Sequence, residues 1–186
     1  ASDIPIHTIS LGERVSSQLA GIALVTGGTY TRAFDETSFG LATTSVIPDV
    51  SDNLVAAVEA PLASGSANRL DVIIDVSNSM WGQIGGRPKI ELAREALQGA
   101  LHDLPPDVAV GLRAYGHRVS VENRNAGCAD TERLLIPVPG NGSEIVDIVN
   151  ELVPRGQTPI ARSLREAAAD LREAGGAGTI LLVSDG

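Results

Sequence analysis

Positions 70–79 of this chain read LDVIIDVSNS, and this stretch indicates both the type of fold and the place of a site. Its first half is apolar and rich in β-branched residues, a composition typical of a buried strand. Asp75, Ser77 and Ser79 then follow at every second position from the end of that strand. Because open α/β sheets bind ligands outside the carboxyl ends of their strands, these oxygen-bearing side chains form a candidate binding site.

Two further polar clusters lie downstream. One is GQTP at 156–159, and the other is SDG at 184–186, directly after an apolar strand expected at 179–183. Carboxylates and hydroxyls are hard oxygen donors, which suit Mg²⁺, Mn²⁺ or Ca²⁺ better than zinc or copper. The alternative is a local role, in which Asp75 and Ser77 cap the following turn and Asp185 begins a β-turn.

The three clusters, in this order, resemble those of a von Willebrand factor A (vWA) domain. The stretches NSMWGQI at 78–84 and RGQTPI at 155–160 are similar to a bacterial subset of that family. The resemblance spans residues 70–186, which correspond to the first part of such a domain, and it implies a metal-ion-dependent adhesion site. The ligands to Mg²⁺ (or Mn²⁺ or Ca²⁺) that it implies are Asp75, Ser77, Ser79, Thr158 and Asp185.

The alternation of strands and helices predicts the fold class. Strands are expected at 70–76, 108–115, 133–138 and 179–184, and helices at 88–104, 143–153 and 159–174. This order is typical of an α/β protein with a Rossmann-like, doubly wound, mostly parallel sheet and helices on both faces. We expect the strand at 70–76 to be central, with 108–115 on one side and 179–184 on the other.

The first 45 residues have a strand–helix–strand pattern of their own. A strand at 4–12, a helix at 14–25 and the turn GGTY at 27–30 resemble the last part of a vWA domain. Residues 46–69, rich in turn-forming residues, are expected to be a linker. Two accounts fit: a fragment cut from tandem domains, or a permuted domain. If residues 1–45 pack in cis, the strand at 4–11 should lie parallel beside 179–184.

Charge and composition limit the partners. The net charge of −9 argues against nucleic acid or an anionic membrane surface. No apolar run is long enough for this segment to insert directly into a membrane.

Cys128, the single cysteine, is either a free loop thiol or half of a disulfide with a cysteine beyond Gly186. The bacterial proteins that the chain resembles often carry cysteines soon after SDG, so an extracellular, periplasmic or cell-surface location is favoured over the cytoplasm.

The donor set and the resemblance together indicate a non-enzymatic adhesion or interaction module. Two carboxylates and three hydroxyls leave a divalent cation electrophilic, so the cation would accept an acidic side chain from a protein partner. No nucleophile–base pair accompanies these residues, which argues against an enzyme. The alternatives are an assembly subunit that tethers an ATPase or a chelatase, and a metal-dependent hydrolase. Trp81 either contacts the ligand or wedges its loop against the next helix.

Overall fold

The structure is a computed structural model in which residues 4–12, 15–34, 37–38, 41–42, 69–102, 104–174 and 178–186 are described. The linker predicted at 46–69 lies outside these residues except for Arg69, which begins a strand. The strand–helix–strand pattern expected near the start of the chain is present as β1, α1 and β2.

The elements alternate as the sequence pattern indicates. The strands are β1 (Ile6–Leu11), β2 (Tyr30–Ala33), β3 (Arg69–Asp75), β4 (Gln83–Ile84), β5 (Arg87–Pro88), β6 (Ala109–Tyr115), β7 (Thr131–Pro139) and β8 (Thr179–Ser184). The helices are α1 (Ser17–Thr26), the 3₁₀ turn η1 (Asn78–Trp81), α3 (Lys89–His102), α4 (Arg124–Gly127), α5 (Gly142–Glu151) and α6 (Ile160–Glu173). Proline precedes α6 rather than opening it, because Pro159 is the N-cap residue.

One mixed sheet organises the described residues, with the strand order β2-β1-β8-β3-β6-β7. Neighbouring strands are parallel except for β6 and β7, which are antiparallel. The prediction that the strand near 70–76 is central is confirmed, since β3 pairs with β6 on one side and β8 on the other. The predicted parallel pairing in cis is also confirmed, because β1 lies beside β8 with Ile6 opposite Ile180.

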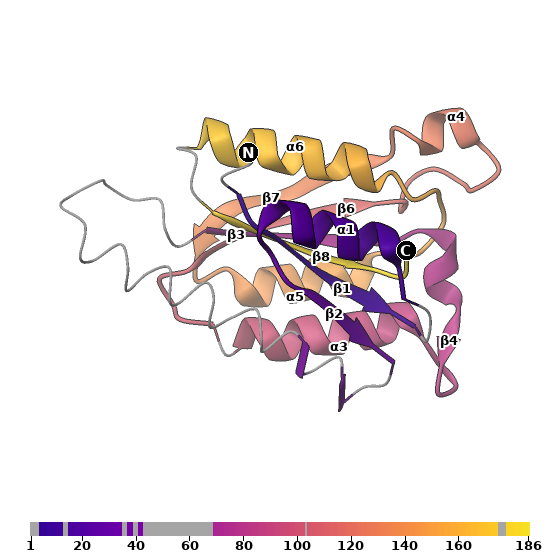
Figure 1. The fold of residues 1–186 in the computed structure, drawn as a ribbon, viewed down its shortest axis with the longest axis horizontal. Coiled ribbons are helices and arrows are strands. Elements are labelled where there is room, and N and C mark those ends of the chain that lie inside the picture. The colour runs from indigo at the N-terminus through magenta and orange to yellow at the C-terminus, as the bar shows by residue number, and fades with distance from the viewer. Residues whose placement is uncertain are drawn as a thin grey trace.

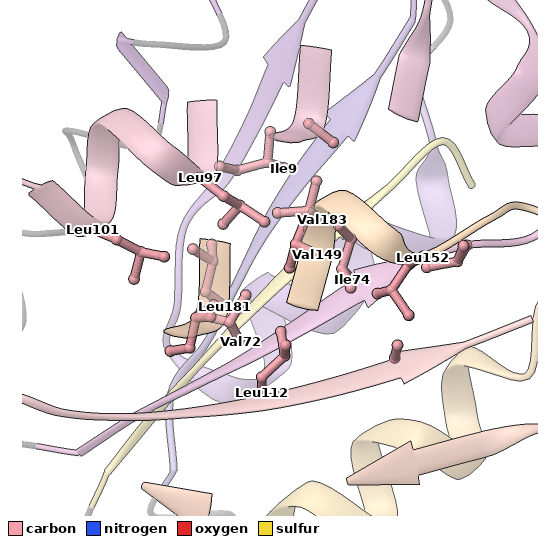
Figure 2. Packing of buried hydrophobic residues seen from close by; sticks show 14 of the residues in the cluster. Ile9, Val72, Ile74, Leu97, Leu101, Leu112, Val149, Leu152, Leu181 and Val183 are labelled. Atoms are coloured by element: carbon pink, nitrogen blue, oxygen red, sulfur yellow. The ribbon is translucent and has the colours of Figure 1, made fainter. Parts of the chain in front are cut away.

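Helices cover both faces of this sheet, as Figure 1 shows, which confirms the predicted α/β, Rossmann-like class. One core lies between the sheet and α3 and α5, where Val72, Leu97 and Val149 meet. Figure 2 shows this cluster from close by. A second core lies on the opposite face, where Ile73 packs with Leu19 of α1 and Leu164 of α6. None of the helices in the described ranges is long and apolar enough to cross a membrane.

The two cores follow from the side-chain alternation of β3. Successive strand residues point to opposite faces, so Val72 and Ile74 enter the first core and Ile73 enters the second. Asp71 and Asp75 share the face of Ile73. That alternation places two acids, both nearly inaccessible to solvent, under the α6 side of the sheet.

Candidate metal centre

The predicted site residues gather where two adjacent parallel strands end. Ile74 of β3 lies opposite Val183 of β8, so the segments that follow them leave the sheet side by side. Asp75 is the last residue of β3, and Asp185 comes directly after β8. Strand pairing therefore brings together two carboxylates that are far apart in the sequence.

A line of hydrogen bonds links four of the five predicted residues. The backbone N–H of Ser77 donates to Oδ1 of Asp75 at 2.8 Å. The hydroxyls of Ser77 and Ser79 are 3.0 Å apart, and Ser79 donates to Oδ1 of Asp185 at 2.8 Å. Ser77 is buried and Ser79 is exposed, so the line reaches the surface at Ser79 and ends at Asp185, whose side chain is only 4% exposed.

Two oxygen separations in this line are ordinary hydrogen-bond lengths that are also compatible with a small divalent cation. Bonds of about 2.1 Å in an octahedral Mg²⁺ site put neighbouring ligand atoms roughly 3 Å apart. The Ser77–Ser79 and Ser79–Asp185 separations of 3.0 and 2.8 Å match that value. Within the described ranges, no group of three or more His, Cys, Asp or Glu side chains is arranged to hold a metal. A cation here would therefore depend on hydroxyl oxygens in addition to the two carboxylates.

Thr158 stands apart from the other four residues. Its loop, between α5 and α6, is attached to the site through the backbone: Ser77 and Gly156 form a parallel bridge, and the N–H of Asn78 donates to Gly156 at 3.0 Å. The Thr158 side chain is exposed, and in the described part of the chain its hydroxyl makes no hydrogen bond with the other four. The loop is attached to the site through its backbone, and the Thr158 hydroxyl is not hydrogen-bonded to the cluster.

Gly116, just after β6, lets three backbone segments meet beneath the site. Its φ of +75° lies in the left-handed region, and a Cβ there would come within 2.6 Å of the Gln157 carbonyl oxygen and 2.8 Å of the Ser77 Cα. Its carbonyl accepts the N–H of Gly156 at 2.7 Å. A larger residue would push the Thr158 loop away from Ser77, so glycine sets the position of that loop.

Asp75 is the most deeply placed member of the site. Burial raises the pKa of the Asp75 carboxyl. Hydrogen bonds from Ser184 and Ser77 favour the ionised form and lower this pKa, whereas the nearby charge of Asp185 raises it. Ser184 donates to Oδ2 of Asp75 at 2.6 Å and accepts from the Tyr115 hydroxyl at 3.1 Å. Because the charge of Asp185 acts on this buried carboxyl, a cation near both acids would stabilise their ionised forms.

Two further residues border the cluster. The Lys89 ammonium lies 2.7 Å from Oδ2 of Asp185, a contact that the sequence analysis did not anticipate and that no local motif signals. The indole N–H of Trp81 donates to the Pro154 carbonyl at 3.0 Å, while the residue stays 47% exposed. Trp81 therefore fastens its loop to the segment before Thr158 and still presents a ring to solvent beside the site.

Comparison with known proteins agrees with the fold and the order of the motifs. The model of the von Willebrand factor type A domain matches residues 72–186, so the chain belongs to the vWA family, whose members generally mediate protein interactions and are generally not enzymes. Among curated proteins it is similar to two uncharacterized proteins of Bacillus subtilis (strain 168). YwmD is 31% identical over 119 residues, covering 62% of this chain and 53% of YwmD. YwmC is 29% identical over 121 residues, covering 62% of this chain and 52% of YwmC.

The chain thus spans about half the length of the curated relatives it matches. No solved structure matches it significantly. The family assignment therefore comes from the sequence model and is consistent with the strand order and the helices on both sheet faces.

Proposed function

We propose that this chain is a metal-dependent protein-binding module that performs no chemistry. Mg²⁺, or Mn²⁺ or Ca²⁺, would be held directly or through water by Asp75, Ser77, Ser79, Thr158 and Asp185. The observation that supports this proposal is the hydrogen-bonded line from Asp75 to Asp185 at the carboxyl edge of the sheet.

The donor set favours a partner that brings a carboxylate. A bound divalent cation would supply an electrophilic coordination position, because three of its five protein ligands are neutral hydroxyls. Ser79 in the cluster and Thr158 in the loop bridged to Ser77 are both exposed, so a partner could reach their hydroxyls. An Asp or Glu side chain of another protein supplies both the negative charge and the hard oxygen that such a position accepts.

The surroundings of the serines favour binding over catalysis. The hydroxyls of Ser77 and Ser79 are hydrogen-bonded to each other and to Asp185. Within the described residues, no histidine or cysteine contacts either hydroxyl, so the usual nucleophile–base pair is absent there. Metal-dependent turnover of a phosphoester or a peptide, lost on Asp75→Asn, would contradict the proposal.

Calorimetric titration of the chelator-treated chain with Mg²⁺ tests the metal site. We expect saturable binding by the wild type and loss of binding in Asp75→Asn and Ser79→Ala. Ser79 is exposed, so the Ser79→Ala chain should keep its fold as judged by circular dichroism. Asp147→Asn, on the exposed face of α5, is the matched control and should bind as the wild type does. Equal binding by all four chains would contradict the assigned ligands.

A displayed library of random peptides tests the acidic partner. The library is panned on the immobilised chain in Mg²⁺, and bound phage are released with EDTA. We expect enrichment of peptides that contain Asp or Glu, and we expect no such enrichment on the Asp75→Asn chain. Peptides that stay bound in EDTA, or that carry no acid, would favour a metal-independent assembly role instead.

We also propose that the module works outside the cytoplasm, in the periplasm or at the cell surface. Cys128 is exposed and is a free thiol in the structure, so a second cysteine could reach it in an oxidising compartment. Cell fractionation with an antibody against the chain tests this location, and recovery from the cytoplasm alone would contradict it.

A further inference from the structure

Lys89 is the only lysine in the 186-residue sequence, and it lies at the candidate metal centre. It is the first residue of α3, and its Nζ is 2.7 Å from Oδ2 of Asp185. The Lys89 side chain is 19% exposed and that of Asp185 is 4% exposed. A positive charge of the protein itself therefore already neutralises one of the two acids in the site.

The lysine is held in this position by the loop that carries Ser79. Its backbone N–H donates to the Gly82 carbonyl at 2.9 Å, and the Gly82 N–H donates to the Ser79 backbone carbonyl at 2.8 Å. A Cβ at Gly82 would lie 3.4 Å from both Cε and Nζ of Lys89. The lysine stem thus passes closely over Gly82, which directs the ammonium toward Asp185.

The lysine and a metal ion need the same carboxylate. Asp185 accepts a hydrogen bond from Ser79 on Oδ1 and from Lys89 on Oδ2, so neither oxygen is without a donor. A divalent cation bound between Ser79 and Asp185 would lie a few ångströms from the ammonium. Like charges at that distance repel strongly where little solvent separates them.

We propose that Lys89 is a built-in competitor of the metal: it neutralises Asp185 in the metal-free chain and is displaced from Asp185 when the divalent cation binds. This inference rests on the proposed function, since it assumes that the same residues bind a metal. This competition would regulate the site. Because the metal ion must displace the Lys89 ammonium, metal binding becomes weaker and more readily reversible.

Lysine rather than arginine at position 89 supports a contact with Asp185 that a metal ion can displace. Apart from the three histidines, every other basic residue in the sequence is arginine. An arginine could bind the Asp185 carboxylate through two parallel hydrogen bonds, whereas lysine carries a single charge on a flexible stem. Lysine at this one position therefore provides a contact that can be broken and reformed without rebuilding the loop.

Metal affinity in the Lys89→Met variant is the first test. Methionine keeps the length and apolar packing of the stem over Gly82 but removes the charge. We expect Mg²⁺ to bind this variant on the order of tenfold more tightly than the wild type in calorimetry. Arg87→Met, two residues away and paired with Glu95, removes the same charge outside the site and should leave the affinity within about twofold of wild type.

Chemical labelling of the single lysine is the second test, and it does not depend on any variant. An amine-acylating reagent is applied to the wild type with and without Mg²⁺, and peptide mass spectrometry measures modification of Lys89 relative to the α-amine. We expect saturating Mg²⁺ to raise the relative labelling rate of Lys89 several-fold, because the displaced amine no longer contacts Asp185.

The outcomes separate this inference from the proposed function. Tighter binding by Lys89→Met together with faster labelling supports the competition, and so does Mg²⁺ binding seen only in that variant. Mg²⁺ that binds the wild type and Lys89→Met equally, or binds the variant more weakly, overturns the competition and leaves the metal site standing. Failure of both chains to bind Mg²⁺ overturns both.

Discussion

Removing the charge of Asp71 should change how the stability of this protein depends on pH. Asp71 lies on β3 and is 2% exposed, and its Oδ1 has no hydrogen-bond partner among the described residues. The neighbouring guanidinium of Arg113 directs its terminal nitrogens to Glu166 and Asp170, at 2.8 and 2.6 Å. The charged form of Asp71 is therefore buried with little direct compensation.

Burial raises the pKa of Asp71 from 3.8 to about 7. Arg113 and Arg133 oppose this rise and the charge of Asp170 adds to it. The folded chain holds the proton over a range in which the unfolded chain has released it, so stability falls as pH rises from about 4 to about 7. At about 1.4 kcal/mol per pKa unit, the contribution lost across this range is about 4 kcal/mol.

The test is urea unfolding of the wild type and Asp71→Asn between pH 4 and pH 8.5, followed by circular dichroism in EDTA. The free energy of unfolding of the variant, relative to that of the wild type, should rise by about 4 kcal/mol between pH 4 and pH 8. Groups common to both chains, including Asp75, cancel in this difference. Asp147→Asn, at an exposed position, should show a flat difference. A flat or falling difference for Asp71→Asn would refute the reasoning.

Two further predictions concern the support of the site. Tyr115→Phe should cost about 1 kcal/mol in urea unfolding, because Ser184 loses its buried hydroxyl donor at 3.1 Å; an unchanged midpoint and slope would count against that contact. Gly116→Ala should cost roughly 2–4 kcal/mol, because strain at φ +75° adds to a close approach to Gln157. Gly140→Ala has the same φ of +75° with no heavy atom within 4 Å of its Cβ, so it should cost only about 1 kcal/mol. Equal losses of stability in Gly116→Ala and Gly140→Ala would contradict the idea that the close approach of Gly116 to Gln157 matters.

The parallel strands could be predicted because their signal is local and strong. The apolar runs that end at Asp75 and Ser184 are buried on both faces of the sheet, so their composition alone marks them. The chain order of the motifs and the rule that sites lie at strand ends then predict that Asp75 and Asp185 lie close together. The family was recognisable for the same reason, since its motifs are tied to strand ends.

Other features depend on contacts between distant segments and leave no local trace. The short β4–β5 pair and the single-turn α4 lie in polar stretches without periodicity, so they were not expected. The run at 70–76 predicts a strand, but nothing in it shows that Asp71 is buried without a hydrogen bond to Oδ1. The carboxylate of Asp75, by contrast, accepts two hydrogen bonds. Lys89 reaches Asp185 across 96 positions of sequence, a contact that only the folded chain defines.

The pairing of β1 with β8 has a consequence for the route by which this protein folds. Ile6 lies opposite Ile180 and Ser10 lies opposite Ser184, so closing this part of the sheet requires the joining of segments from nearly the whole sequence. Such non-local closure is slow, since the chain loses its freedom before the contacts form. β8 lies between β1 and β3 and is followed directly by Asp185. Pairing of β8 with β3 aligns Asp75 with Asp185. A cation site built on these two acids would therefore require that non-local pairing to be in place.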